Sequence, residues 1–573
     1  MCGIAGLLGS ADANMARRMI AAIAHRGPNG VRVEAGADFA FAHARLSIID
    51  LEGGWQPLHA PGVEVIGNGE IYNYLELITE FQLGGKMQTA ADFEPLIHIY
   101  RQLGDEALDE LRGMYALCLR ADGAAPLLAR DPFGIKPLYV RKLGASTLFA
   151  SEPRALFAAD DAPRVVDPGK AQELLALNYT LGEQTIFQGV TRLAPGAATA
   201  GRINRSFVSS THAPVPMDEA TALRRLDEVL EDSVQVHQRS DVPYGLFLSG
   251  GLDSAAIATV MSGLATRPVT AFTCGFEGAS LSAEGASDER GAAERIARTL
   301  NLDWRETSFG PEDFWTIAPQ VAWALDDPTT DFATLPTYKL AQDAKSDMTV
   351  VLTGEGGDEL FGGYGRYRRA LRPAWLGGRA SEPQIDAPFL VDGGAGALAR
   401  WRASSTPREG LTRLQQAQAA DMATWLPNDL LLKLDRCLMA HGLEGRTPFL
   451  DKVVAEFAFH LPDDLKVRGR HGKWLLRRWL ERRCPTADAW GRKKGFTVPV
   501  AGWIAPRAAD LGPQIAASEG VRQICDADAV RTVFTDDKHA ANRWPLLFYA
   551  LWWAIHIGGA TPADASDAII GRV

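Results

Sequence analysis

The stretch Leu248-Ser249-Gly250-Gly251-Leu252-Asp253-Ser254 separates two apolar runs and decides the fold of the second half of the chain. Residues 242–248 before it form a run short enough for a buried strand, and residues 255–261 after it have the composition of a packed helix. Two adjacent glycines between a strand and a helix let the backbone turn tightly and direct N–H groups toward an anion. The stretch therefore predicts a phosphate-binding loop. It has neither the lysine of a Walker loop nor the three-glycine spacing of a dinucleotide-binding loop.

Strands and helices alternate around this loop. A helix is expected over residues 220–237, and further strands over residues 269–276 and 349–353. Such alternation implies a parallel sheet with right-handed crossovers, which binds ligands at the carboxyl ends of its strands. The third strand ends in a second glycine-rich turn, Gly354-Glu355-Gly356-Gly357-Asp358-Glu359, so both loops should lie at one edge of the sheet. After Phe361 the chain is expected to be mostly helical, with an exposed Gly/Pro-rich excursion over residues 377–396.

The first 200 residues have a different texture. Short β-rich runs separated by Gly, Pro, Asn and Asp predict stacked antiparallel sheets with a few helices. These runs are residues 39–41, 64–66, 115–119, 127–129, 137–140 and 147–150. Residues 200–216 are polar and proline-containing, as in a linker. The chain is therefore divided into an α+β domain over residues 1–205 and an α/β domain with a helical extension over residues 217–573.

Composition narrows the class of protein. The 573 residues are 46% hydrophobic and 23% charged, as in ordinary soluble proteins, and the net charge of −11 argues against a nucleic-acid-coating surface. Six cysteines form neither a zinc-type spacing nor a dense disulfide framework, which fits a reducing cytoplasm. No secretion signal is expected at the N-terminus, and residues 545–557 are too short for a membrane span of ~20 residues, so we expect a buried helix there. Small-molecule chemistry, without nucleic-acid or membrane partners, is the expected class.

Cys2 is a candidate nucleophile. Removal of Met1 would make Cys2 the first residue, and an α-amino group with a pKa of roughly 7.7–8.0 could accept the proton of its own thiol. The alternative is an incidental cysteine at the start of the chain. The residue alone does not decide between the two.

Several motifs accompany Cys2 along the first domain. The chain resembles class II glutamine amidotransferase domains, of the N-terminal-nucleophile hydrolase type, in the order and spacing of Met1-Cys2-Gly3-Ile4-Ala5-Gly6, His25-Arg26-Gly27-Pro28, Ala44-Arg45-Leu46-Ser47-Ile48-Ile49-Asp50, Asn68-Gly69-Glu70-Ile71-Tyr72-Asn73 and Asp131-Pro132-Phe133-Gly134-Ile135-Lys136-Pro137-Leu138-Tyr139. The resemblance implies that Cys2 hydrolyses the side-chain amide of glutamine and releases ammonia.

The same resemblance implies roles for individual residues. The side chain of Asn68 and the backbone of Gly69 would form the oxyanion hole, Arg45 would bind the glutamine α-carboxylate, and Asp92 its ammonium. Leu46, Ile48, Ile49 and Glu70 would complete the glutamine site. Asp92 departs from the family pattern, because Ala91 and Phe93 flank it where Ser or Thr and Thr are usual. Arg26 could equally brace the turn before Gly27-Pro28.

The second domain resembles the ATP-pyrophosphatase half of glutamine-hydrolysing asparagine synthetases, of the adenine nucleotide alpha hydrolase type. The motifs that carry this resemblance are the loop at residues 248–254, Leu352-Thr353-Gly354-Glu355-Gly356-Gly357-Asp358-Glu359-Leu360-Phe361-Gly362-Gly363-Tyr364, Lys433-Leu434-Asp435-Arg436, Arg446-Thr447-Pro448-Phe449-Leu450-Asp451, Gly472-Lys473-Trp474-Leu475-Leu476-Arg477 and Lys493-Lys494-Gly495-Phe496-Thr497-Val498-Pro499. Together the two resemblances cover nearly the whole chain. Small departures, at Thr353, Gly445 and Asp327, remove no charge needed for adenylation.

The implied chemistry is acyl activation. ATP converts a carboxylate into an acyl-adenylate with release of pyrophosphate, and ammonia then displaces AMP. Asp253 and Asp358 would hold Mg²⁺, and Glu355 and Lys473 would lie at the acyl centre. The implied ATP contacts are Leu248, Ser249, Gly250, Gly251, Asp253, Ser254, Cys274, Thr353 and Gly354. Arg446 and Asp451 are interpreted as a structural ion pair, whereas Lys493 or Lys494 could either bind phosphate or be solvated.

The predicted reaction converts glutamine, aspartate and ATP into asparagine, glutamate, AMP and pyrophosphate. Two alternatives stay open: the same chemistry on another carboxylate acceptor, and a regulatory or binding homologue with a decayed site. Intact Cys2, Asp253 and Asp358 argue against the second. The motifs describe the activation step and not the acceptor, and a homodimer is compatible with them without being implied.

Overall fold

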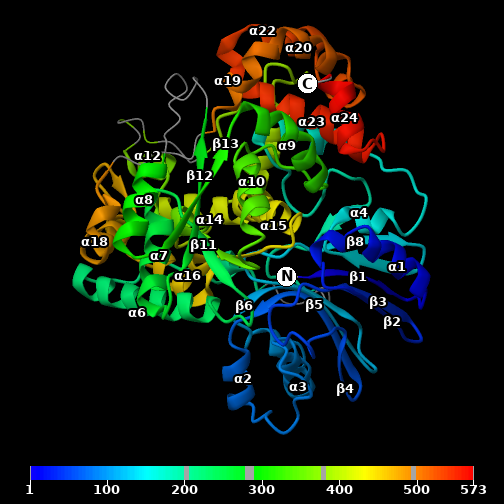
Figure 1. The fold of residues 1–573 in the computed structure, drawn as a ribbon, viewed down its shortest axis with the longest axis vertical. Helices are drawn as coiled ribbons and strands as arrows, with labels where there is room; N and C mark the ends of the chain where they lie inside the picture. Colours follow the sequence, from blue (N-terminus) through cyan, green and yellow to red (C-terminus); the bar gives the residue numbers. More distant parts are fainter. Residues whose placement is uncertain are drawn as a thin grey trace.

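The structure is a computed structural model and describes residues 2–198, 205–277, 289–373, 375, 378, 382–491 and 498–571. An N-terminal domain with two antiparallel sheets packs against a larger domain built on a parallel sheet (Figure 1). The C-terminal helices gather at one end of the larger domain (Figure 1), where Trp552 also meets Phe187 of the N-terminal domain. This arrangement confirms the predicted fold class of both halves.

Two antiparallel sheets stack face to face in the N-terminal domain. One has the strand order β10-β8-β9-β1-β3-β2 and the other β4-β5-β6-β7. Side chains from both sheets, including Phe41, Ile66 and Phe149, form the core between them. The strand bounds are β1 Gly3–Leu8, β2 Val31–Ala35, β3 Phe39–Ala44, β4 Leu58–Ala60, β5 Val63–Ile71, β6 Gly113–Ala121, β7 Leu127–Arg130, β8 Tyr139–Leu143, β9 Ser146–Ala150 and β10 Val190–Arg192.

Helices cover both outer faces of this pair of sheets. Along β3, Phe39 and Phe41 face the other sheet while Ala40, Ala42 and Ala44 face α1, because successive strand residues point to opposite sides. The alanines leave room for Met19 and Ile20 of α1. The helices of this domain are α1 Ala13–Ala21, α2 Tyr74–Glu80, α3 Glu94–Leu103, α4 Pro153–Phe157 and α5 Pro168–Leu177.

The larger domain contains a five-stranded parallel sheet in the order β13-β12-β11-β14-β15. Its strands are β11 Tyr244–Phe247, β12 Thr270–Phe276, β13 Asp303–Phe309, β14 Val350–Leu352 and β15 Glu444–Arg446. One face packs on α6 Glu219–His237, α7 Leu252–Leu264 and α8 Arg290–Thr299, and the other on α9 Pro311–Ala324 and α10 Thr334–Ala344. The three strands and two helices expected around the glycine loop are thereby confirmed.

A helical extension follows β14, and the last strand of the sheet, β15, lies in the sequence between α15 and α16. The helices are α11 Gly357–Phe361, α12 Gly365–Leu371, α13 Ala395–Ser404, α14 Arg413–Ala423, α15 Leu431–Met439, α16 Lys452–Phe459, α17 Asp463–Lys466, α18 Trp474–Arg483, α19 Val500–Ile504, α20 Ala508–Ala517, α21 Glu519–Ile524, α22 Ala527–Thr535, α23 Arg543–His556 and α24 Pro562–Ile569. The predicted buried helix is α23, whose residues are almost all buried. Among the described residues no helix combines the length and apolarity that a membrane span requires.

The exposed excursion predicted over residues 377–396 is wrong in part. Phe389 is fully buried, and Leu390 forms a β-bridge with Cys525. The Gly/Pro-rich composition marked an irregular backbone, but these two apolar side chains are packed under the C-terminal helices. Residues 374, 376–377 and 379–381 lie outside the described part of the chain.

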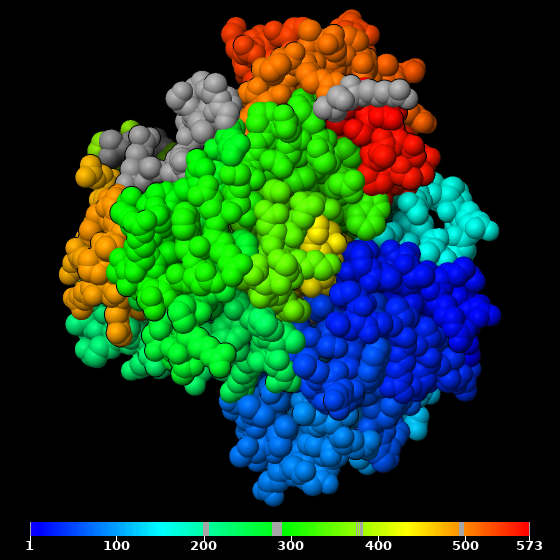
Figure 2. Space-filling model, in the orientation of Figure 1, coloured from blue at the N-terminus to red at the C-terminus, as the bar shows by residue number. Residues whose placement is uncertain are grey.

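The described part of the predicted linker contacts both domains. Residues 199–204 lie outside the described residues, but Phe207 in the short helix η3 Phe207–Ser210 is buried. Its ring stacks on Phe133 of the N-terminal domain at 4.9 Å and meets Phe459 of the larger domain at 5.8 Å. In the space-filling view the N-terminal domain (blue) lies directly against the larger domain (green) (Figure 2).

Candidate functional site

Cys2 lies immediately before β1 and is half-buried. Its Sγ is 3.8 Å from the Leu46 carbonyl oxygen, and its backbone nitrogen donates to Asn68 Oδ1 at 3.1 Å. Burial raises the pKa of the thiol, so the sulfur is protonated at neutral pH and requires a base before it can act as a nucleophile. The contact with Asn68 places the Cys2 nitrogen, which would be the α-amine after removal of Met1, inside the site.

Strand β5 brings Asn68 and Gly69 to Cys2. The Asn68 side chain is fully buried, and its Nδ2 has no hydrogen-bond partner among the described residues. Gly69 has a φ of +152°, and a Cβ there would lie 2.0 Å from the Met114 carbonyl oxygen, so only glycine fits. A buried donor without a partner beside a nucleophile has the chemistry of an oxyanion hole.

Arg45 follows β3 on the same side of the sheet. Its guanidinium lies 5.0 Å from the centre of the Trp55 ring and donates through one terminal nitrogen to the Asp50 carbonyl oxygen. The other terminal nitrogen has no hydrogen-bond partner among the described residues. A guanidinium with one terminal nitrogen held by a hydrogen bond and the other available can bind a carboxylate. Leu46 and Ile48 are buried next to it and Ile49 is half-buried.

Two carboxylates from neighbouring segments, Glu70 and Asp92, complete this site. Asp92 accepts a hydrogen bond from the Ile71 backbone at 2.8 Å, and burial raises its pKa to about 7. Burial, followed by the charge of Asp92, raises the pKa of Glu70. The unusual neighbour Phe93 fills space left by Gly67, where a Cβ would be 2.2 Å from the ring. The departure from the family pattern is therefore accommodated by packing and leaves Asp92 in place.

The predicted ion pair between Arg446 and Asp451 is wrong. Arg446, at the end of β15, pairs with Glu444 at 2.6 Å and with Glu70 of the N-terminal domain at 3.1 Å. Asp451 instead pairs with Arg112 at 2.8 Å and caps α16. The strand directs Arg446 across the domain interface, which nearness in sequence could not reveal. A strand of the larger domain thus reaches the candidate glutamine site.

The glycine-rich loop at residues 248–254 follows β11 and leads into α7, as predicted. Ser249 and Ser254 contact each other through their hydroxyls at 3.0 Å, and the Ser249 hydroxyl also accepts from the Gly251 nitrogen at 3.2 Å. The loop borders a cavity of about 270 Å³, which is also lined by Asp358, Gly363, Lys473 and Arg477. Helix α7 begins at Leu252, so its N-terminus faces the cavity and favours an anion.

Lys473 joins the two acidic residues of the loops. Its Nζ is 2.8 Å from Asp358 and also forms an ion pair with Asp253. The backbone of Lys473 has a φ of +55°, an uncommon conformation for a residue other than glycine. Gly363 packs closely against both side chains. A Cβ at this position would be 1.7 Å from Asp358 and 2.4 Å from Lys473, so the packing requires glycine.

Asp253 and Asp358 provide a donor set for Mg²⁺. Asp253 and Asp358 converge on one ammonium, so their oxygens lie at the edge of the same cavity. Mg²⁺ is usually bound by one or two carboxylates together with phosphate oxygens. The donor set therefore fits Mg²⁺ that arrives with a nucleotide. Within the described residues no cluster of three or more His, Cys, Asp or Glu side chains could hold a metal by itself.

The remaining predicted nucleotide contacts cluster at the same strand ends. Cys274 is buried on β12. It lies two residues after Phe272, the last residue of β12 that pairs with β11. The Leu248 carbonyl oxygen accepts from Thr273 at 2.7 Å, and the Thr353 hydroxyl is directed at the Arg446 carbonyl oxygen at 3.4 Å. Gly354 approaches Asp253 so closely that a Cβ would be 2.8 Å away.

Glu355 is half-buried on the second glycine-rich turn. Burial raises the pKa of its carboxyl group, and the charge of Lys433 opposes this shift. Lys433 itself pairs with Asp331 at 2.8 Å. The motif Lys433-Leu434-Asp435-Arg436 did not indicate that the charge of Lys433 acts on Glu355, and sequence reasoning missed this effect. Lys493 and Lys494 lie outside the described residues.

Comparison with known proteins follows the same division of the chain. Residues 225–555 match the family described as asparagine synthase, and residues 1–210 match the glutamine amidotransferase domain. The chain belongs to the asparagine synthase family. Asparagine synthetase [glutamine-hydrolyzing] 1 of Bacillus subtilis is 31% identical over 97% of both chains. A putative asparagine synthetase [glutamine-hydrolyzing] of Mycobacterium tuberculosis is 34% identical over 99% of this chain and 97% of its own.

Asparagine synthetase B of Escherichia coli is more distant. It is 28% identical over 84% of this chain and 78% of its own length. The similarity to these three relatives covers both domains, as the motifs predicted. Membership of the asparagine synthase family thus rests on the whole chain and not on one domain.

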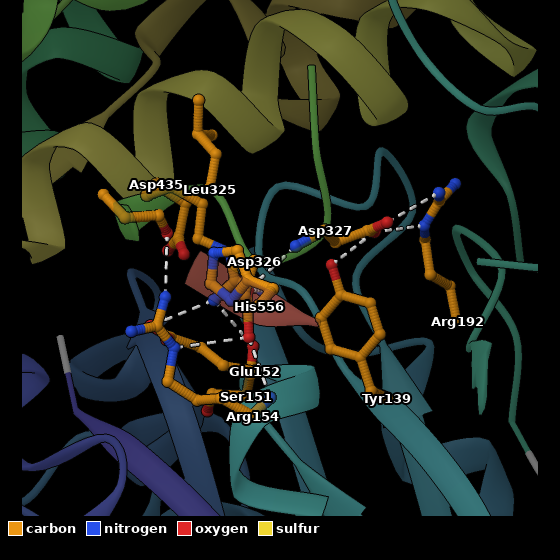
Figure 3. A network of polar contacts seen from close by, with 12 residues as sticks. Tyr139, Ser151, Glu152, Arg154, Arg192, Leu325, Asp326, Asp327, Asp435 and His556 are labelled. Carbon is orange, nitrogen blue, oxygen red and sulfur yellow. Dashed lines mark hydrogen bonds and ion pairs between the residues drawn. The ribbon is translucent and has the colours of Figure 1, made fainter. Parts of the chain in front are cut away.

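The domain interface of this asparagine synthase family member contains a buried network that sequence reasoning missed (Figure 3). Arg436 of the larger domain pairs with Glu152 at 3.0 Å and with Asp326 at 3.2 Å, and Arg26 pairs with both Glu152 and Asp435. These side chains come from distant parts of the sequence. Of these residues, only those in the motifs around Arg26 and Asp435 were singled out from the sequence. The motifs did not indicate which residues pair.

Proposed function

We propose that the protein is an ATP-dependent, glutamine-hydrolysing asparagine synthetase, and that the predicted site residues act in two separate sites. The observation that carries the proposal is the presence of two complementary sites in one chain: a half-buried Cys2 beside an available amide donor, and a glycine-rich loop beside two carboxylates and a lysine. Similarity to asparagine synthetases over both domains supports the same conclusion.

The first site would hydrolyse glutamine. The thiol proton of Cys2 passes to its own α-amino group, and the sulfur attacks the side-chain amide carbon of glutamine. Asn68 Nδ2 and the Gly69 backbone N–H stabilise the negative charge on the amide oxygen. The amide nitrogen takes up a proton and leaves as ammonia, and water then hydrolyses the thioester to glutamate. Arg45 and Asp92 hold the two charged ends of the substrate.

The second site would activate aspartate. An oxygen of the β-carboxylate attacks the α-phosphorus of ATP, and pyrophosphate leaves into the loop formed by Ser249, Gly250, Gly251 and Ser254. Bound Mg²⁺, held by Asp253 and Asp358, would neutralise phosphate charge. Ammonia then attacks the acyl carbon, AMP leaves with the bonding electrons, and the nitrogen loses a proton. Lys473 would stabilise the charge on the departing groups, and Glu355 would accept the proton.

The setting of these reactions is part of the proposal. All six cysteines are free, which supports a reducing cytoplasm. Glutamine, aspartate and ATP are the proposed substrates, and a route between the sites is required because ammonia released into water would be protonated and lost. The rival acceptor, another carboxylate, uses the same activating residues and differs only in the group that receives ammonia.

Pyrophosphate release measured against a panel of carboxylic acids, each with ATP, Mg²⁺ and ammonia, tests the acceptor. The proposal expects the strongest signal with aspartate, accompanied by equal amounts of AMP and asparagine. A strong signal for another acid with none for aspartate would replace the acceptor but leave the chemistry intact. No pyrophosphate with any acid, beside normal glutamine hydrolysis, would refute the synthetase assignment.

A further inference from the structure

Arg26 connects the nucleophile to the larger domain. It ends the short helix η1 Ala24–Arg26, its side chain is fully buried, and its Nε donates to the Cys2 carbonyl oxygen at 3.3 Å. Its two terminal nitrogens donate to the two carboxylate oxygens of Asp435 at 2.8 and 3.0 Å. One planar guanidinium therefore holds the Cys2 main chain on one edge and an Asp435 fork on another. Such bidentate pairs fix orientation as well as distance.

Asp435 is itself held rigidly. It lies on α15, where Lys433 pairs with Asp331 at 2.8 Å and Arg436 pairs with Glu152 at 3.0 Å. The helix is thus pinned by ion pairs on both sides of Asp435. A displacement of the Asp435 carboxylate would have to break buried contacts, so the helix provides a fixed point for Arg26.

Three arginines face three carboxylates in the network, and the charge of buried Lys136 also acts on Asp435. Arg26, Arg154 and Arg436 face Glu152, Asp326 and Asp435, and each of these side chains is at most 8% exposed. Loss of one carboxylate charge would leave an arginine buried without full compensation. The arginine most affected by loss of the Asp435 charge is Arg26, because the other carboxylate that it contacts, Glu152, is shared with Arg436 and Arg154.

A second ion pair at the same interface serves as a control for a purely structural role of the Arg26–Asp435 contact. Asp327 accepts from Arg192 at 2.6 and 3.1 Å and from the Tyr139 hydroxyl at 2.8 Å, and it is as deeply buried as Asp435 (Figure 3). This pair also joins the two domains, but its side chains make no contact with Cys2 or Arg26 among the described residues. The chain therefore supplies its own control for interface stability.

We propose that Asp435 of the larger domain is a positioning residue for glutamine hydrolysis, because through Arg26 it fixes the main chain of Cys2. This inference rests on the proposed function. The attacking sulfur must be held within a fraction of an ångström of its productive position, and a misplacement of about 1 Å can cost about 100-fold in rate. Asp435 touches neither glutamine-binding residues nor the phosphate loop, so its loss should lower kcat and leave the KM for glutamine close to the wild-type value.

The test compares Asp435→Asn with Asp327→Asn. Glutamate release is measured over a range of glutamine concentrations, and ammonia-dependent asparagine formation and thermal unfolding are measured on the same samples. For Asp435→Asn we expect a fall in glutamine-hydrolysis kcat of about 10- to 100-fold, a KM within about twofold, and retained ammonia-dependent synthesis. For Asp327→Asn we expect a lowered Tm without a selective loss of kcat.

Wild-type kcat in Asp435→Asn, or an equal loss of kcat in both variants, would overturn the inference. If Asp435→Asn does not fold, Arg26→Lys decides, since lysine keeps the charge but cannot hold both Asp435 and the Cys2 carbonyl. Arg26→Lys with wild-type kcat would also overturn it. If the wild-type protein forms no asparagine from ammonia, the proposed function fails instead, and glutamate release still reports on Asp435.

Discussion

Replacement of Arg446 by methionine should destabilise the protein strongly at neutral pH. The Arg446 side chain is fully buried and makes four polar contacts: 2.6 Å to Glu444, 3.1 Å to Glu70, and 2.9 and 2.7 Å to the His237 and Arg239 carbonyl oxygens. Methionine fills a similar volume but leaves two buried carboxylates without this partner. Removal of one member of a buried ion pair costs about 3–5 kcal/mol. With about 2–4 °C per kcal/mol for a domain of ordinary size, we expect Tm to fall by about 6–20 °C.

The pH dependence of this loss can be worked out from Glu444. Burial alone would raise the pKa of Glu444, but nearby positive charges including Arg446 hold it at about 2. A carboxylate with a lowered pKa stabilises the fold above its unfolded pKa of about 4.3 and loses that contribution as pH falls through about 2. Without Arg446 the pKa values of buried Glu444 and Glu70 both rise, so the stability that the variant loses relative to wild type grows as pH increases above about 2.

Thermal unfolding at pH 5 and pH 8 therefore checks the reasoning. The difference in Tm between Arg446→Met and wild type should be larger at pH 8 than at pH 5. The control is Arg402→Met, which removes an exposed ion pair with Glu382. Its Tm should equal that of wild type within experimental error at both pH values. A difference in Tm for Arg446→Met that is small, or the same at both pH values, would refute the role assigned to Arg446.

Three further predictions concern the two sites. Gly363→Ala would place a Cβ 1.7 Å from Asp358 and 2.4 Å from Lys473, so pyrophosphate release should be lost while glutamate release from glutamine is retained; retained pyrophosphate release would contradict the assigned geometry. Asn68→Ala should lower the kcat of glutamine hydrolysis by about 10²–10³ without affecting ammonia-dependent synthesis, and an unchanged kcat would exclude Asn68 from the oxyanion hole. Asp92 has a pKa raised by burial to about 7 and loses its charge below that value, so the KM for glutamine should rise as pH falls through about 7. Asp92→Asn should remove that dependence, and a KM profile identical to wild type would contradict the ammonium contact.

Local sequence patterns predicted the elements that carry the chemistry. The apolar runs on either side of Gly250-Gly251 became β11 and α7, because a short buried strand and a packed helix each have a recognisable length and composition. The expected strands at residues 269–276 and 349–353 became β12 and β14, shortened by one or two residues at their ends. Strand ends are the least certain feature of such patterns, because pairing with neighbouring strands decides them.

Contacts between distant segments could not be predicted in the same way. Arg446 pairs with Glu70 across 376 residues of sequence, and Arg26 with Asp435 across 409. Nothing in the local composition of either segment indicates its partner, so nearness in sequence suggested Asp451 for Arg446 instead. The burial of Phe389 was missed for the same reason, since the helices that cover it follow more than a hundred residues later.

The division of labour between the two sites is the central claim, and Cys2→Ala tests it most directly. Asparagine formation by this variant should be measured with ATP, Mg²⁺ and aspartate, once with glutamine and once with ammonia as nitrogen source. We expect glutamine-dependent synthesis to be abolished and ammonia-dependent synthesis to match wild type, because the thiol acts only in the first site. Loss of both activities in a folded variant, or glutamine-dependent synthesis that survives, would contradict the account.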